Sequence, residues 1–289
     1  MDASCDGDSY FRIRFGSHVK YAIVAAGSLT NDEICLPLYQ FPPLPWDQNT
    51  WNVVYLSRRS SDQTFQTQLS KVALAGVKEV WHPNSVDCLQ LERTRIFNME
   101  TYECIRVDKN DSKTKSFQIP MVAKIARFDF EIPYIENETH IYHLLEGTDI
   151  APGFLGHIHE DGRIMGMLLK KIKGRYAGIE DLNMCQEALK QLHKLGLLHG
   201  DINRYNFIVT KYKKVYLLDF VNSREAEDEH ELEQERSILA DRLRDESGEG
   251  APYSDNDEND ENDENDENDD NGDNGDKEEE DEKEGKDLD

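Results

Sequence analysis

Two short stretches of this 289-residue chain combine residue types that together could transfer a phosphoryl group. Residues 199–206 read His-Gly-Asp-Ile-Asn-Arg-Tyr-Asn, which has the form H-x-D-x-x-x-x-N, and Asp219-Phe220 begins 18 residues after Asp201. In phosphoryl transfer one aspartate accepts the proton of the attacking hydroxyl, while an asparagine five residues later and a second aspartate hold magnesium. Asp201 and Asn206 are therefore the candidate catalytic pair, with Asn206 and Asp219 as candidate magnesium ligands.

The segment between the two aspartates predicts a β-hairpin. Residues 207–209 and 215–218 are apolar and strand-like, and residues 211–214 form a lysine-rich turn. Because a hairpin returns the chain to the edge where it started, both aspartates would meet at one edge of a cleft. Asp and Asn are common in loops for turn chemistry alone, but the spacing and the following strand argue against that simpler interpretation.

A lysine and a glutamate upstream form a second candidate pair. Residues 119–126 predict a strand in which Val122 and Lys124 share one face. Residues 134–146 predict a helix that follows a proline, and Glu138 falls on its apolar face by helical spacing. A glutamate in that position is costly to bury without a cation, so Lys124 is its expected partner.

Taken together, these segments resemble the protein-kinase-like fold, and in particular a group of short fungal kinase-like proteins, some of which carry the misleading label "alpha-galactosidase A". The similarity runs from about residue 81 to residue 250. The matching segments are residues 81–83, 122–128, 136–139, 154–157 and 199–207.

The resemblance implies an α+β, bilobal fold with a reduced helical C-lobe, and it implies ATP and Mg²⁺ as cofactors. In the resembled fold Lys124 would reach the phosphates while Glu138 holds it, and Val122 would pack on the adenine ring. His199 would pack and hydrogen-bond to support the catalytic loop. Residues 169–172, with Lys171 among them, would form the hinge whose backbone binds adenine.

Several departures from the kinase pattern keep a second hypothesis open. Gly200 replaces the arginine of many protein kinases, and no glycine lies between Gly76 and Gly147, where a glycine-rich loop would close on the phosphates. Val221 follows Asp219-Phe220 in place of glycine. The leading hypothesis is an ATP- and magnesium-dependent phosphotransferase for an unknown hydroxyl compound or protein. The alternative is a pseudokinase that binds a partner without catalysis.

The order of segments predicts four parts. Residues 1–80 would be an N-terminal extension of mixed α/β structure, residues 81–169 the N-lobe, residues 170–250 the C-lobe, and residues 251–289 a disordered acidic tail. Strands are expected within residues 10–27, a short helix within 64–80, and helices at 180–195 and 227–245. The proline-rich residues 41–46 are expected to form a rigid, partly buried loop.

Charge and cysteine usage exclude several classes of partner. The net charge is −26, of which residues 251–289 contribute −18 and residues 1–250 contribute −8, so no basic face for nucleic acid is expected. Five cysteines without a C-x-x-C pair suggest reduced thiols. With no apolar run of membrane-span length, we expect a cytoplasmic or nuclear protein that does not bind membranes. The acidic tail would increase solubility or bind basic proteins.

Overall fold

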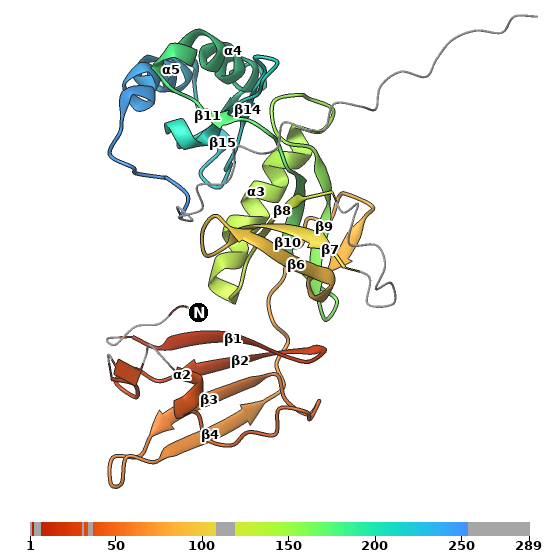
Figure 1. The fold of residues 1–289 in the computed structure, drawn as a ribbon, viewed down its shortest axis with the longest axis vertical. Helices are drawn as coiled ribbons and strands as arrows, with labels where there is room; N and C mark the ends of the chain where they lie inside the picture. The colour runs from red at the N-terminus through yellow and green to blue at the C-terminus, as the bar shows by residue number, and fades with distance from the viewer. Residues whose placement is uncertain (1, 3–6, 31, 34–36, 108–118, 254–289) are drawn as a thin grey trace, which may run out of the picture. The chain divides into compact units, whose positions relative to one another are not determined.

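The first part of the chain forms a four-stranded sheet in the computed structural model, which describes residues 2, 7–30, 32–33, 37–107 and 119–253. Its strands lie in the order β1 (Ser9–Phe15), β2 (His18–Val24), β3 (Val53–Arg58) and β4 (Phe65–Ser70) (Figure 1). A short helix, α2 (Pro37–Gln40), precedes the proline-rich loop. Phe41, Leu44 and Trp46 of that loop pack against a buried cluster that includes Trp51 and Leu56, which confirms a packed loop.

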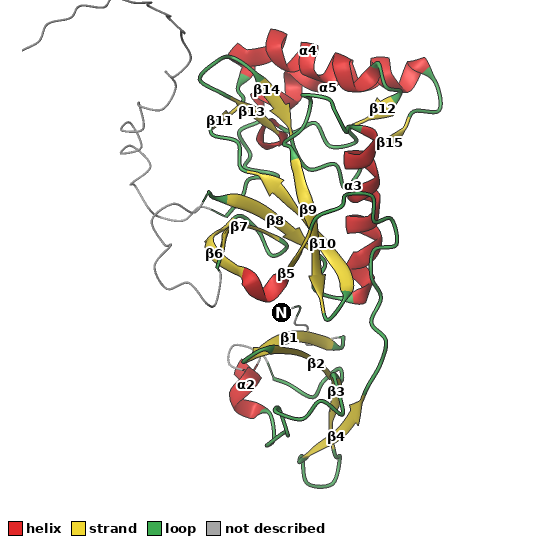
Figure 2. Cartoon of the chain, turned by 90° about the vertical axis from the view of Figure 1, so that its right-hand side faces the viewer, coloured by secondary structure: helices red, strands yellow, loops and turns green. Residues whose placement is uncertain are grey.

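A second, six-stranded sheet carries the lysine of the candidate site. Its spatial order is β5-β9-β10-β8-β7-β6, formed by β5 (Ser85–Asp87), β6 (Leu91–Ile96), β7 (Thr101–Arg106), β8 (Met121–Ile125), β9 (Phe154–Glu160) and β10 (Arg163–Lys170). Helix α3 (Ile132–Leu144) lies along this sheet and packs against β10 (Figure 2). Ile135 and Ile141 of α3 share one hydrophobic core with Ile158 and Met167 of the sheet, so this helix is held against the strand that neighbours β8.

The remaining elements surround the candidate catalytic loop. They are β11 (Arg175–Tyr176), α4 (Leu182–His193), β12 (Leu197–Leu198), β13 (Phe207–Val209), β14 (Val215–Leu217), β15 (Arg224–Glu225) and α5 (Glu229–Arg244). Helix α4 packs on both α5 and β14. Its buried stripe of Cys185, Leu189 and Leu192 explains this placement, and Gly196, with φ of +75°, turns the chain after the helix. Mixed sheets with few helices make this an α+β fold.

The structure corrects three details of the sequence analysis. The helix expected within residues 64–80 is absent; β4 occupies residues 65–70 because its backbone pairs with β3. Helix α3 begins at Ile132, two residues before the predicted start, since proline fits the first helical turn. Residues 251–253, assigned to the disordered tail, are held instead: the Tyr253 backbone N–H donates to the Phe97 carbonyl at 2.6 Å. The other tail residues, 254–289, lie outside the described residues.

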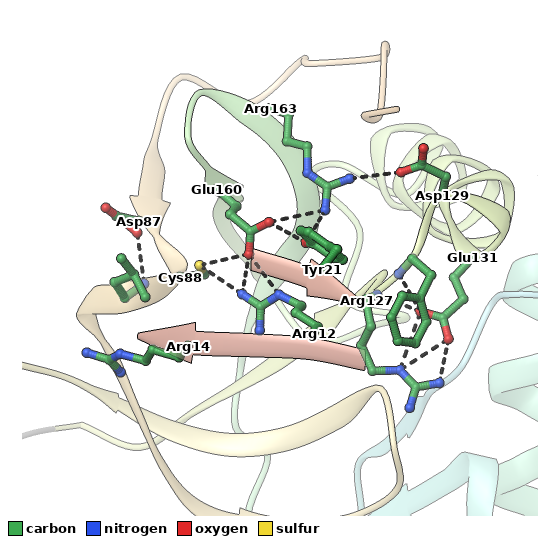
Figure 3. Close-up of polar contacts among 12 residues, drawn as sticks. Arg12, Arg14, Tyr21, Asp87, Cys88, Arg127, Asp129, Glu131, Glu160 and Arg163 are labelled. Atoms are coloured by element: carbon green, nitrogen blue, oxygen red, sulfur yellow. Dashed lines mark hydrogen bonds and ion pairs between the residues drawn. The ribbon is translucent and has the colours of Figure 1, made fainter. Parts of the chain in front are cut away.

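A buried polar cluster joins the β1–β4 sheet to the six-stranded sheet (Figure 3). Arg12 of β1 donates through Nε to a Glu160 carboxylate oxygen at 2.7 Å, and the Tyr21 hydroxyl also donates to Glu160. Arg163 donates to the Tyr21 hydroxyl oxygen at 2.6 Å and to Glu160 at 3.2 Å. Burial, and then the Glu160 charge, raise the pKa of Tyr21, so its hydroxyl keeps the proton it donates. Glu160 thus pairs with Arg12 across the contact and with Arg163 of its own sheet, and Arg163 also lies 3.4 Å from Asp129 Oδ1.

Within the part of the chain that the structure describes, no helix combines the length and apolar character needed to cross a bilayer.

Replacing Glu160 with alanine should destabilise the protein, because Arg12 and Arg163 would lose their shared buried counter-ion. Breaking a buried pair from one side costs about 3–5 kcal/mol, so we expect a loss of about 3 kcal/mol in the free energy of unfolding, measured by urea titration. Arg59→Ala is the matched control, since Arg59 pairs with Asp62 at 3.5 Å on the exposed surface and should lose less than about 1 kcal/mol. Equal losses in the two variants would show that the cluster does not stabilise the fold.

Candidate active site

The loop that carries Asp201 begins with a glycine that no other residue can replace without rearrangement. Gly200 has φ of +81°, and a Cβ at this position would lie 2.2 Å from the Asn222 carbonyl oxygen. Both the backbone conformation and the close approach therefore require glycine. The absence of the arginine found here in many kinases thus has a steric cause: a larger residue would push the loop away from residue 222.

Two asparagine amides hold the Asp201 carboxylate. Asn203 Nδ2 lies 3.1 Å from both carboxylate oxygens, and Asn206 Nδ2 donates to the Asp201 carbonyl at 2.8 Å and to Oδ2 at 3.2 Å. Asn203 also accepts from the Tyr205 N–H at 2.9 Å, which caps the short 3₁₀ turn that ends at Asn206. Because the Asn206 amide nitrogen donates to Asp201, its amide oxygen is the atom suited to bind a cation.

The predicted hairpin forms, and it connects Asp219 to the Asp201 loop. Phe207 of β13 pairs with Leu217 of β14, and the Leu218 N–H donates to the Asn206 carbonyl at 2.9 Å. The buried His199 ring lies between the two aspartate segments: its Nε2 is 2.8 Å from the Leu218 carbonyl, and the Asp201 N–H donates to its Nδ1 at 3.3 Å. Burial lowers the pKa of His199, and a neutral ring protonated at Nε2 satisfies both contacts. Its expected supporting role is confirmed.

Lys124 connects the six-stranded sheet to both α3 and Asp219. Its Nζ lies 2.7 Å from Glu138 Oε2 and 2.6 Å from Asp219 Oδ1. The second Glu138 oxygen accepts the Phe220 N–H at 3.1 Å, so Glu138 fixes the residue that follows Asp219. The ion pair expected between Lys124 and Glu138 is present, and the contact with Asp219 extends it to a triad.

The charges of this triad favour an ionised Asp219. Burial opposes the charge on Lys124, but Glu138 and then Asp219 outweigh it and raise the lysine pKa. Burial also opposes the ionisation of Asp219, yet Lys124 lowers the pKa of this carboxyl below its usual value. The Asp219 side chain is 42% exposed, whereas those of Lys124 and Glu138 are 7% and 1% exposed. Asp219 is therefore the carboxylate of the triad that an incoming cation can reach.

The two residues expected near adenine lie along the same sheet. Val122 on β8 pairs with Leu169 on β10 and packs against the main core. Lys171 follows β10, and its Nζ lies 2.5 Å from Glu103 Oε2. Because that side chain pairs with Glu103, any contact between this position and a nucleotide would be made by the backbone. The roles of Val122 and Lys171 stay predictions.

The hairpin β6–β7 lies in the glycine-free stretch where the kinase-like resemblance implies a glycine-rich loop. Asn98 closes its turn by accepting from the backbone N–H groups of Glu100 and Thr101, at 2.9 and 2.7 Å. The Glu100 carbonyl accepts from the N–H of Ile125, the residue after Lys124, at 3.0 Å. Burial, and then the nearby Glu131, raise the pKa of Glu100. The turn thus places the acidic Glu100 close to Lys124. A negative charge on Glu100 would repel a phosphate group that no cation neutralises.

Sequence analysis missed Glu235 of α5. Its carboxylate lies 2.6 Å from His193 Nε2 and accepts the backbone N–H groups of Gly200 at 2.7 Å and His199 at 3.2 Å. It therefore fixes the start of the Asp201 loop to α5. Helical spacing, which placed Glu138 on an apolar face, would also have identified Glu235. It lies between the buried Leu232 and Leu239 on the apolar face of its helix.

The candidate cation ligands, Asn206 and Asp219, offer the oxygen donors that magnesium prefers. Among the described residues, no group of three or more His, Cys, Asp or Glu side chains is placed to hold a metal ion. The predicted pair, Asn206 and Asp219, supplies only two side-chain oxygen donors. Magnesium is commonly bound by one or two carboxylates, with water and substrate phosphates completing its shell. This donor set therefore fits Mg²⁺ that arrives with a nucleotide.

Similarity to known proteins falls on the loop and hairpin described above. Residues 160–236 match the RIO domain family. This is an atypical protein-kinase-like family of ATP-binding phosphotransferases. The match includes Asp201, Asn206 and Asp219, while Lys124 and Glu138 precede it. No curated protein matches the chain. The kinase-like resemblance is supported at this level, and the relation to a fungal group stays a prediction.

Replacing Glu235 with glutamine should destabilise the protein, because the carboxylate accepts three hydrogen bonds while buried. Hydrogen bonds to charged groups contribute about 1.5–3 kcal/mol, and we expect a loss of about 2 kcal/mol in the free energy of unfolding near neutral pH. The matched control is Glu233→Gln, an exposed position on the same helix, which should leave stability nearly unchanged.

The pH dependence of this effect has a defined sign. Burial opposes the ionisation of Glu235, but the bonds from His193, Gly200 and His199 outweigh it and lower its pKa. A carboxyl with a lowered pKa in the folded state stabilises above its unfolded pKa of about 4.3, and this stabilisation disappears as pH falls through the folded pKa. The difference between wild type and Glu235→Gln, measured by urea unfolding, should shrink below about pH 4. A constant difference would show that the ionised carboxylate is not what holds the loop.

Proposed function

We propose that the protein is an ATP- and magnesium-dependent phosphotransferase that acts on a hydroxyl group of a small molecule or protein not yet identified. The RIO domain match supports the reaction class. The observation that carries the proposal is the position of Asp219. Its carboxylate lies 2.6 Å from Lys124, and the preceding residue, Leu218, connects through His199 to the Asp201 loop. Base, cation ligand and phosphate-binding lysine therefore belong to one connected arrangement.

Asp201 would act as the base in this reaction. The acceptor oxygen bonds to the γ-phosphorus while the bond from that phosphorus to the β–γ bridging oxygen breaks, and ADP leaves with the electron pair. The acceptor proton passes to the Asp201 carboxylate, which Asn203 and Asn206 hold in place. General-base assistance of this kind typically contributes about 10²–10⁴-fold in rate.

The other residues would bind the nucleotide. Asn206 and Asp219 would hold magnesium, which when bound neutralises phosphate charge. Lys124 would contact the α- and β-phosphates while Glu138 keeps it oriented, and Val122 with the backbone around Lys171 would border the adenine. We further propose that residues 81–169 and 170–250 act as the two lobes of a kinase-like body, with residues 1–80 as an added domain.

A binding module without catalysis is the second candidate function. The β6–β7 hairpin favours it, because this hairpin lacks glycine and places Glu100 near Lys124. The family match does not favour it, since the matched family is one of ATP-binding phosphotransferases.

Two aspartate variants should separate binding from catalysis. Mg-ATP at 100 times its dissociation constant should stabilise the wild-type protein by about 2.7 kcal/mol, measured as a thermal shift. Asp201→Asn should keep this shift and lose about 100-fold or more in phosphate release or transfer from labelled ATP, because only the base is removed. Asp219→Asn should lose most of the shift, because it removes charge from the magnesium site.

The control is Asp241→Asn, since Asp241 lies on the exposed side of α5 and pairs with Arg244 at 3.0 Å on the surface. It should keep both the shift and the turnover. If Mg-ATP gives no shift and wild type and Asp201→Asn release phosphate equally, the binding-module hypothesis replaces the enzyme.

A further inference from the structure

The chain that follows α5 has a defined path past the Asp201 loop. The Ser247 N–H donates to Asp245 Oδ1 at 2.8 Å, and the Glu249 N–H donates to Ser247 Oγ at 3.2 Å. The Ala251 N–H then donates to the Gly248 carbonyl at 3.1 Å. These local bonds close successive turns, so residues 245–253, called the strap below, hold a specific conformation instead of trailing from the helix.

The strap contacts the candidate site at two separate places. At Gly250, with φ of +80°, a Cβ would lie 2.8 Å from Asn203 Nδ2, the amide nitrogen that donates to the Asp201 carboxylate. Three residues later, the Tyr253 N–H donates to the carbonyl of Phe97, at the turn of the β6–β7 hairpin, at 2.6 Å. The strap therefore extends from the Asp201 loop to the hairpin near Lys124.

A cavity of about 310 Å³ remains between the strap and the catalytic loop. Asp201, Asn203 and Arg204 line it on the loop side, and Asp245 and Glu249 line it on the strap side. This volume is at the lower end of the range of ligand pockets, about 300–1,000 Å³. The lining is polar and carries both signs of charge, so the space suits a small polar molecule better than an extended peptide with apolar side chains.

We propose that the strap selects the phosphate acceptor by size. While the strap lies against the Asp201 loop, water or a small polar hydroxyl compound reaches Asp201, and polypeptides are excluded. This inference rests on the proposed role of Asp201 as the base. Residues 245–253 lie outside the catalytic motifs and outside the RIO domain match, which ends at residue 236. Their role in selecting the acceptor is therefore additional to what the match implies.

Two pairs of full-length variants test the strap. In each pair, one variant should release the strap and the matched control should leave it in place. Gly250→Ala brings a Cβ against Asn203. Gly248→Ala has a similar positive φ, +82°, but its Cβ meets no atom within 4 Å among the residues that the structure describes. Tyr253→Pro removes the N–H that binds Phe97, whereas Tyr253→Ala keeps it. The strain common to both glycine positions therefore cancels within the first pair.

The readout is the size of reagent that reaches the cavity. A cysteine introduced by Arg204→Cys is labelled with either N-ethylmaleimide or a polyethylene-glycol maleimide, and the modified site is identified by mass spectrometry. In the Gly248→Ala and Tyr253→Ala backgrounds the small reagent should react several-fold faster than the large one. In the Gly250→Ala and Tyr253→Pro backgrounds the large reagent should gain several-fold in rate, while the small reagent changes little.

Phosphate transfer from labelled ATP to a mixed pool of serine, threonine and tyrosine peptides provides the second readout, with Arg204 intact. Transfer to peptides should rise several-fold in Gly250→Ala and Tyr253→Pro. Hydrolysis to water should change little in Tyr253→Pro, the variant that leaves Asn203 and its bonds to Asp201 untouched. Equal rates for the large maleimide in all four backgrounds would overturn the proposal that the strap restricts access to Asp201. Unchanged peptide transfer in variants that turn over ATP would overturn it as well. Size-selective labelling without ATP turnover in any variant would instead contradict the phosphotransferase and leave the strap as a cover of Asp201.

Discussion

The ammonium group of Lys124 is the charge on which the arrangement of the candidate site depends. It lies between Glu138 at 2.7 Å and Asp219 at 2.6 Å, and its side chain is only 7% exposed. An isolated charge in such a position would be strongly destabilising, so the lysine requires both carboxylates nearby. Because the three residues come from β8, from α3 and from the end of the β13–β14 hairpin, one interaction fixes three elements. It also compensates an unfavourable backbone conformation, since Asp219 has φ of +62°.

Two buried helix glutamates hold the backbone beside the two aspartates. Glu138 accepts the N–H of Phe220, next to Asp219, and Glu235 accepts the N–H of Gly200, next to Asp201. Each glutamate also faces a lysine or histidine, at 2.7 Å for Lys124 and 2.6 Å for His193. Buried carboxylates that bind backbone N–H groups restrict loop movement, which is what a site needs when its geometry must exist before the ligand arrives.

Local patterns predicted the parts of this structure that depend on short-range signals. Helical spacing placed Glu138 on a buried face, and two short apolar runs on either side of a lysine-rich turn predicted the hairpin that leads to Asp219. The same helical spacing would have revealed Glu235 had it been applied to α5. Sequence could not predict contacts that depend on how distant elements pack, such as Arg12 with Glu160, 148 residues apart, or Lys124 with Asp219, 95 residues apart. Segment 64–80 was misassigned for a related reason: β4 exists because β3 offers it a paired edge.

Calorimetric titration of ATP into the full-length protein, with magnesium and again with EDTA, tests most directly whether the site around Lys124 and Asp219 binds ATP through magnesium. Lys124 supplies a cation for the phosphates, while Asp219 is an ionised carboxylate that repels them unless a divalent ion intervenes. Saturable binding should therefore be observed with magnesium and be much weaker in EDTA. Equal binding under both conditions, or no binding under either, would contradict a magnesium-dependent nucleotide site.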